Sequence, residues 1–223
     1  MANHAQNRKN AQPVLSDGLT PIDDIQRALP ELLKEHGELR GLHIRGCTLD
    51  LDAVDAPFVD FSGCLFERCV ITLRSTRRCG FTDVLFRGCD LSNANFHKST
   101  FIRAALQDSK ALGANFSEAI LRGFTARDSI LRYANLTACK LTSVFFETCD
   151  MTQTSLESCK LSGLILDQCN LRGVTFSFTA LKDIDLTTCD LQGIRANPAD
   201  LRGAIIAGHQ AVDLAGLLGV VIR

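Results

Sequence analysis

Large apolar side chains recur at every fifth position over most of the chain. Between residues 61 and 206 this frame holds 30 positions, and 26 of them are Leu, Phe, Ile or Met. The residue two positions earlier is mostly small or β-branched, and the one between is often Asn, Asp or Lys, as in ANFHK, ANFSE and ANLTA. A period of five fits neither a helix nor a single strand, whose periods are about 3.6 and 2. The pattern therefore predicts a solenoid of short repeats.

The cysteines follow the same frame. Nine of the ten occupy its small position: Cys64, Cys69, Cys79, Cys89, Cys139, Cys149, Cys159, Cys169 and Cys189. Their spacing contains no C-x-x-C pair, which zinc sites and redox motifs commonly use. We therefore expect these thiols to be buried and inert, with no metal site and no cofactor. Cys47 lies outside the frame, so its role stays open.

Over residues 40–208 the repeat resembles the pentapeptide-repeat family, whose consensus is A(D/N)LXX. The resemblance implies an all-β fold, a right-handed quadrilateral β-helix with four pentapeptides per coil and short helical caps at both ends. Residues 20 apart would then lie one strand spacing apart, about 4.8 Å. Phe61, Phe81 and Phe101 would stack in one column of the core.

The ends of a solenoid expose apolar cross-sections, so we expect caps there. Residues 1–17 are polar and are predicted to be a disordered tail. Residues 18–40 are predicted to form the N-terminal cap, with a helix that begins near Pro21 and is capped by Thr20. The coil is assigned to residues 41–208, with its first turns irregular where the frame slips at 49–56. Residues 209–223 are predicted to form a helix and a strand.

The C-terminal stretch LQGIRANPADLRGAIIAGHQAVDLAGLLGVVIR is similar to the tail of the bacterial quinolone-resistance pentapeptide proteins. In that group the tail caps the coil and forms a head-to-head two-fold dimer, so the resemblance implies a homodimer here. The alternative is a cap that folds back on its own coil. The interface candidates are the apolar residues of the tail: Leu214, Leu217, Leu218, Val220 and Val221.

Composition narrows the class of function. With 24 basic and 25 acidic side chains the formal charge is −1, which argues against direct nucleic-acid binding. The five histidines are scattered, and a coil filled with side chains leaves no substrate cleft, so we expect no enzymatic activity. The first residues, MANHAQNRKNAQPV, hold no signal-peptide core, and the longest apolar run, residues 214–222, is shorter than the roughly 20 residues of a membrane span. We therefore expect a cytoplasmic protein without membrane contact.

One side of the predicted coil combines acidic residues with outward apolar ones, which is typical of a protein-binding surface. The alternative is a solvated surface with scattered apolar side chains. The candidate binding residues are Leu65, Leu85, Asp108, Asp128, Phe145, Glu147, Ile165, Asp167 and Asp185.

The resemblance to the quinolone-resistance group implies protection of DNA gyrase and topoisomerase IV by imitation of a DNA duplex. The rod shape, the tail and the acidic side agree with it, whereas the near-zero net charge and the uninterrupted frame differ. We predict a non-enzymatic protein-binding rod that interacts with these topoisomerases and gives tolerance to a gyrase-directed antibiotic or toxin. The alternative is a structural or regulatory adaptor unrelated to topoisomerases.

Overall fold

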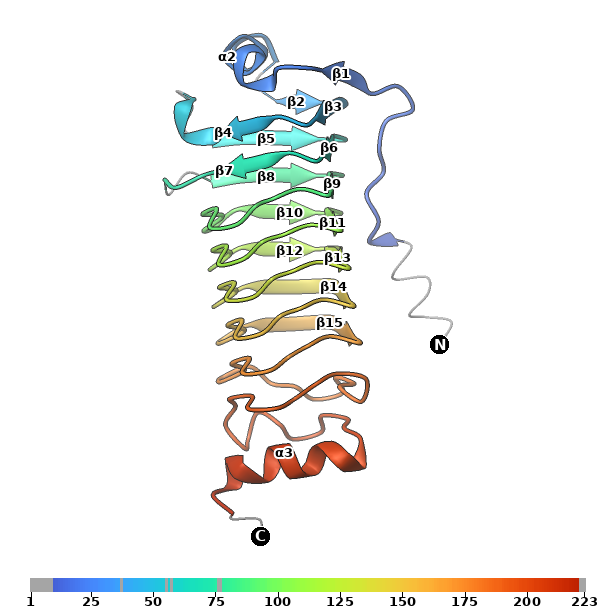
Figure 1. Ribbon diagram of the computed structural model, residues 1–223, viewed down its shortest axis with the longest axis vertical. Helices are drawn as coiled ribbons and strands as arrows, with labels where there is room; N and C mark the ends of the chain where they lie inside the picture. Colours follow the sequence, from blue (N-terminus) through green and yellow to red (C-terminus); the bar gives the residue numbers. More distant parts are fainter. Residues whose placement is uncertain (1–9, 37, 55, 57, 76–77, 221–223) are drawn as a thin grey trace.

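The computed structural model describes all residues except 1–9, 37, 55, 57, 76–77 and 221–223. The chain winds into a rod of stacked coils (Figure 1). Parallel pairing joins Phe81 to Phe101 and Phe101 to Leu121, so these coils contain 20 residues each. This is the right-handed quadrilateral β-helix that the sequence predicts.

Most of the short strands form two adjacent sides of the coils, β4 and β7 pair on a third side, and isolated bridges continue the ladder elsewhere. The longest two, β14 and β15, continue from one side to the next. The strands are β1 (Thr20–Ile22), β2 (Leu39–Arg40), β3 (Leu42–Arg45), β4 (Thr48–Asp50), β5 (Phe58–Ser62), β6 (Leu65–Glu67), β7 (Val70–Thr72), β8 (Arg78–Thr82), β9 (Leu85–Arg87), β10 (Thr100–Ile102), β11 (Ala105–Gln107), β12 (Ile120–Arg122), β13 (Thr125–Arg127), β14 (Lys140–Glu147) and β15 (Lys160–Asp167).

The apolar frame fills the axis of the rod. Phe61 and Phe81 stack with ring centroids 5.6 Å apart, and Phe81 and Phe101 stack at 4.9 Å. Most corners place the residue two after the apolar centre in the left-handed conformation, as at Gly123 (φ +61°) and Asp83 (φ +55°). The backbone therefore accounts for the five-residue length of the repeat, because one left-handed residue turns the chain into the next side.

The cysteines of the frame have a structural role. All nine are buried, as predicted, and Cys47 is half-buried. The thiol of Cys139 donates to the carbonyl of Phe116 at 2.9 Å, and that of Cys159 donates to Leu136 at 3.1 Å. Burial raises the pKa of Cys159 to about 11, so its reactive thiolate form is suppressed.

Helix α2 (Ile25–His36) caps the N-terminal end of the rod, with Ile25 and Leu29 buried against the first coil. It begins later than predicted, because residues 20–22 pair as β1 with β3. The residue that caps it is Asp24, which accepts the amide of Arg27 at 3.1 Å, and Thr20 has no such role. Gln26 accepts the amide of Asp50 at 2.7 Å and donates to its carbonyl at 3.3 Å, which satisfies the open edge of β4.

The first coil is irregular, as the frame slip predicts. Leu39 pairs with Phe61 and Ile44 with Phe66, so this coil contains 22 residues in place of 20. The extra residues lie at the short 3₁₀ helix η1 (Leu51–Ala53), whose Leu51 remains buried in the core. The insertion is absorbed at one corner, and the register is regular from there on.

A continuous helical segment closes the C-terminal end: η2 (Gly208–Gln210), α3 (Ala211–Ala215) and η3 (Gly216–Leu218). Gln210 is buried, and its amide donates to the carbonyls of Leu186 at 2.9 Å and Cys189 at 2.7 Å. Of the predicted strand, Val220 is irregular and residues 221–223 lie outside the described part of the chain. No helix within the described ranges is long and apolar enough to cross a membrane.

The structure corrects the prediction of a disordered tail for residues 10–17. These residues run beside the coils from β1 toward the middle of the rod (Figure 1). Ala11 is buried, and the amide of Val14 donates to Asp83 Oδ1 at 3.0 Å. The polar composition misled the prediction, because this segment is held by a surface that the coil provides. Residues 1–9 lie outside the described ranges.

Candidate protein-binding surface

The rod has four sides, which we number in chain order. Side 1 is centred on Phe81, Phe101 and the residues stacked with them, and side 2 on Phe86 and Leu106. Sides 3 and 4 follow, centred on the columns of Leu91 and Phe96. The corner between sides 1 and 2 is a column that contains Gly63, Asp83, Arg103, Gly123, Ser143 and Gly163.

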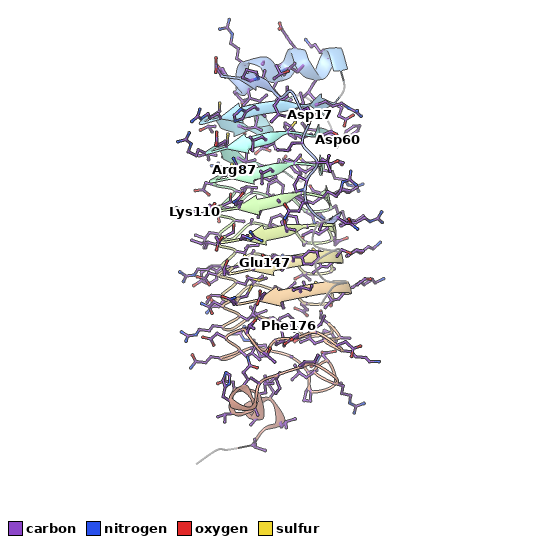
Figure 2. All side chains as sticks on the ribbon, turned by 90° about the vertical axis from the view of Figure 1, so that its right-hand side faces the viewer. Asp17, Asp60, Arg87, Lys110, Glu147 and Phe176 are labelled. Carbon is purple, nitrogen blue, oxygen red and sulfur yellow. The ribbon has the colours of Figure 1, made fainter. Side chains whose placement is uncertain are left out.

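The nine predicted binding residues all lie on side 2 or at its following corner. The pairing of Leu65 with Leu85, Phe145 with Ile165, and Glu147 with Asp167 establishes the shared column. Figure 2 views the rod from the direction of this side, with Asp17 near the N-terminal end and Arg87 and Glu147 further along. The sequence register thus placed the set correctly in space.

The predicted exposure is wrong for two of these residues. Leu65 is 8% exposed and Phe145 is 1% exposed, although both occupy outward positions. At equivalent positions on side 3, Val70 is 43% exposed and Ile130 is 38% exposed. Side 2 therefore buries outward apolar groups that side 3 leaves in solvent, and its apolar surface is smaller than the sequence suggests.

The N-terminal half of side 2 is basic. Its residues 43–46, 65–68 and 85–88 carry Arg45, Arg68 and Arg87 against the single acid Glu67. Glu67 lies 3.3 Å from His43 Nε2, 3.3 Å from Arg45 Nε and 4.0 Å from Arg87 Nη1. Burial raises the pKa of Glu67, but the hydrogen bond from His43 and the nearby arginines outweigh it, so the pKa lies below its usual value. This acid is ionised and its charge is compensated.

The C-terminal half of side 2 is acidic. Its residues 105–108, 125–128, 145–148, 165–168 and 185–188 hold five acids against one base. This base is Arg127, which pairs with Glu147 at 2.8 Å. Asp167 accepts the hydroxyl of Thr188 at 3.2 Å, and Asp185 accepts that of Thr187 at 2.6 Å. Because hydroxyls are neutral donors, these contacts orient the carboxylates without cancelling their charge. We call the five acids the acidic strip: Asp108, Asp128, Glu147, Asp167 and Asp185.

The fold and the repeat can now be compared with known proteins. The family model described as "Pentapeptide repeat region" matches residues 79–148 and 139–214, more than half of the chain. The chain belongs to the pentapeptide-repeat family. None of the curated protein sequences matches it.

The chain is similar to solved structures of pentapeptide-repeat proteins at low sequence identity. The plasmid-mediated fluoroquinolone resistance protein QnrB1, as a trypsin-treated variant, is 23% identical, with a TM-score of 0.44 over 92% of this chain and 99% of its own. HetL, involved in heterocyst differentiation regulation in the cyanobacterium Nostoc, is 18% identical, with a TM-score of 0.31 over 76% and 89%. A thylakoid lumen protein of Arabidopsis thaliana is 24% identical, with a TM-score of 0.36 over 44% and 66%.

A feature that the sequence did not predict lies beside side 2 of this pentapeptide-repeat protein. Residues 10–16, which we call the strap, follow the corner between sides 1 and 2. A Cβ on Gly123 would lie 3.3 Å from Ala11 Cα, and one on Gly63 would lie 3.2 Å from Ser16 Oγ. The only sequence signal is the recurrence of glycine at this corner, at 63, 123, 163 and 203. Glycine there lets a second backbone approach closely.

Side 3 carries a separate group of exposed apolar side chains in its middle coils. Leu112 is 39% exposed, and Tyr133 is 50% exposed with the Arg132 guanidinium 5.6 Å from its ring centroid. Together with Ile130 they make a small apolar patch that the sequence reading did not select, because its members occupy three different positions of the repeat. Such a patch is also typical of a protein-binding surface.

The predicted dimerisation residues separate into two groups. Leu214 and Leu217 are partly buried and pack against the end of the core, as cap residues do. Leu218 is 68% exposed and Val220 is 52% exposed, so both are directed into solvent. Val221 lies outside the described part of the chain. The helical segment therefore combines a capping face with an apolar outer face.

Proposed function

We propose that this pentapeptide-repeat protein is a non-enzymatic, cytoplasmic protein-binding rod whose partner is DNA gyrase or topoisomerase IV. The observation that carries the proposal is the acidic strip on the C-terminal half of side 2. Successive carboxylates lie one coil apart along the axis, about 4.8 Å, and Asp108 shares a column with Asp128, as Glu147 does with Asp167. Duplex DNA carries about one negative charge per 1.7 Å of its axis, so enzymes that hold it present basic surfaces. A rod with a row of carboxylates offers such a basic surface a ligand that is negatively charged, as DNA is.

In this proposal the rod occupies the DNA-binding surface of the topoisomerase and does not contact nucleic acid itself. A drug or toxin that acts on the enzyme–DNA complex then has less of its target, and the cell gains tolerance. The near-zero net charge of the chain is compatible with this, because the charges are divided between a basic and an acidic half of the same side. The N-terminal half of side 2 keeps the other end of the rod from binding the same basic surface.

The test is the effect of the purified protein on DNA supercoiling by gyrase, together with the quinolone tolerance of cells that express it. The variant Asp108→Asn, Asp128→Asn, Asp167→Asn removes three charges from the acidic strip. Asp108 and Asp128 have left-handed backbones (φ +50° and +49°), a conformation that Asn tolerates well. We expect about tenfold more protein to be needed, because three interface charges contribute roughly 0.5 kcal/mol each.

The matched control removes three charges from side 3 with Asp90→Asn, Asp150→Asn, Asp190→Asn. Each Asn keeps a side-chain oxygen that can accept the backbone amide two residues later. These amides belong to Ser92, Thr152 and Gln192. The control should act on gyrase as the unchanged protein does. Absence of any effect of the unchanged protein on gyrase and on tolerance would contradict the proposal. An equal loss in both variants would exclude the acidic strip as the contact.

The second candidate function is a structural or regulatory adaptor unrelated to topoisomerases. The observation that favours it is the apolar patch of Leu112, Ile130 and Tyr133 on side 3, which an electrostatic partner of side 2 does not use. The substitution Tyr133→Ser weakens binding of an adaptor partner and leaves any gyrase effect unchanged. The two functions are thus distinguished by the side on which substitutions weaken binding: side 2 for the topoisomerase and side 3 for an adaptor partner.

We further propose that two copies associate through their C-terminal ends. The exposed side chains of Leu218 and Val220 support this, because a two-fold interface brings the same apolar patch of each copy together. Sedimentation of the full chain should show a dimer, and Leu218→Lys should convert it to a monomer. A monomer before any substitution would leave the helical segment as a cap only.

A further inference from the structure

The strap runs parallel to the axis of the rod. Val14 is bound at Asp83, and Ala11 lies against Gly123, two coils further along the same corner. Two coils span about 9.6 Å, and three residues of extended chain span about 10 Å. Ala11 lies in a turn and Gln12 in a bend, and residues 13–16 have no regular secondary structure, so the strap crosses the coils instead of joining their ladder.

The strap overhangs side 2 at the boundary between its basic and acidic halves. A cleft of about 240 Å³ separates the strap from that side. Gln12, Pro13 and Leu15 form the strap wall of the cleft. The opposite wall includes Leu85, Arg87, Ala105, Gln107, Thr125, Arg127 and Glu147. Of the acidic strip, Glu147 lines this cleft, whereas Asp108 and Asp128 lie at the opposite corner of side 2.

A protein partner of the acidic strip needs more surface than the strip provides. The strip is roughly 20 Å long at about 4.8 Å per coil, and roughly 10 Å wide for a three-residue strand. A stable protein interface covers about 800 Å² on each partner. The partner must therefore extend over neighbouring surface, and the corner between sides 1 and 2 is where the strap lies.

The strap is held by few contacts. Among residues 10–20, all of which are described, only Ala11 is buried, and Val14 is 69% exposed. Its acceptor, Asp83, is also held by Arg103, with Nε 2.6 Å from Oδ1 and Nη2 2.5 Å from Oδ2. When the strap leaves, Asp83 keeps this ion pair and Gly123 keeps its corner. The strap can therefore detach while the coil stays intact.

We propose that the strap is an intramolecular competitor of the protein partner of side 2, so that partner binding requires its displacement. The inference rests on the proposed function, since it concerns the regulation of the same surface. The competitor and the partner share one surface, and the basic surface of a topoisomerase is the occupant that displaces the strap. Weakening the strap should then strengthen partner binding with no change in side 2 itself.

The test compares two variants that introduce the same residue at adjacent positions. Ala11→Glu places a carboxylate at a buried site and should release the strap, because an unpaired charge is not tolerated there. Gln12→Glu places it at an exposed site of the strap wall, in the cleft that Arg87 and Arg127 also line, and should keep the strap bound. Thermal unfolding of both variants should match that of the unchanged chain, since the coil is untouched.

Strap release is measured first, without any partner. A reporter thiol, Gln107→Cys, lies in the wall of the cleft, and a second, Thr175→Cys, lies on side 4. Labelling with a bulky maleimide, followed by peptide mass analysis, distinguishes each reporter from Cys47. The Gln107→Cys reporter should label several-fold faster with Ala11→Glu and no faster with Gln12→Glu. The reporter on side 4 should label equally in all chains. Equal labelling of the cleft reporter in every chain would overturn the proposal.

Partner binding is measured second, as the protein concentration needed to affect supercoiling by purified gyrase. Ala11→Glu should act at a several-fold lower concentration than the unchanged chain, and Gln12→Glu at no lower a concentration. Faster labelling with no change in this concentration would overturn competition and leave the proposed function standing. If no chain affects gyrase, Ala11→Glu included, the proposed function fails, and the competition with it.

Discussion

In the N-terminal half of the rod, the core is a stack of phenylalanine rings. Phe101 alone lies within 4.9–5.8 Å, centroid to centroid, of Phe81, Phe96, Phe116 and Phe124. In the C-terminal half Leu141, Leu161 and Leu181 continue the column of Phe101, and phenylalanine remains at Phe146 and Phe176 of the other columns. Both halves keep the same 20-residue coil. The register thus depends on an apolar side chain at each centre and accepts different shapes.

The outer surface of side 2 differs between the halves as well. In the N-terminal half the acid Glu67 is compensated by arginines, and the strap lies along the adjoining corner. In the C-terminal half Arg127 pairs with Glu147, whereas Asp167 and Asp185 accept hydroxyls and keep their charge. Because the outward positions carry no part of the coil's register, they can differ from coil to coil. A regular solenoid can therefore hold a local binding surface.

The largest expected effect comes from the core. Phe101→Ala should lower the free energy of unfolding by about 3–5 kcal/mol, because it removes a fully buried ring and its four ring contacts. Leu181→Ala, in the same column of the C-terminal half, should lower it by about 2–4 kcal/mol. Chemical denaturation measures both. A loss at Phe101 no larger than at Leu181 would show that the ring stack adds nothing beyond apolar burial.

A control for this comparison is Phe178→Ala. Phe178 is 70% exposed at a corner, so its removal should change the free energy of unfolding by less than about 0.5 kcal/mol. A larger loss would mean that exposed aromatic residues of this rod are buried in solution against a second copy of the chain. The stability of each half would then include contacts with that copy.

An intermediate effect is expected at the corner between sides 1 and 2. Gly123→Ala and Gly163→Ala both place a Cβ on a left-handed residue, so each should cost about 1–2 kcal/mol of stability. Only at Gly123 does the new Cβ meet the strap, at 3.3 Å from Ala11 Cα, whereas at Gly163 it meets Ser143 at an ordinary 3.7 Å. Hydrogen exchange at the Val14 amide should therefore accelerate in Gly123→Ala alone. Equal exchange in both variants would place the strap elsewhere.

The sequence predicts the coil and cannot predict the strap. Each coil position is specified by its own residue, because a small or large apolar side chain is required every fifth position. The strap is specified by surfaces that exist only after folding, such as the paired carboxylate of Asp83 and the bare backbone of Gly123. The same reason explains the error at Leu65 and Phe145, whose outward positions are correct but whose burial depends on the surroundings of side 2. Local periodicity carries no information about such contacts.

The smallest effect concerns the pH dependence of the strap. Burial raises the pKa of Asp83, but the hydrogen bonds from Arg103 and the Val14 amide outweigh it and hold the pKa below its ordinary value. The contribution of this carboxylate is thus fully present above its unfolded pKa of about 3.9 and is lost as the pH falls through the lower folded value. The nuclear Overhauser contact between the Ala11 methyl group and Gly123 should persist from neutral pH to about pH 5 and weaken below about pH 4. In Asp83→Asn it should be weaker at neutral pH and independent of pH over this range. Loss of the contact already near pH 6 would show that protonation of a histidine, and not of Asp83, releases the strap.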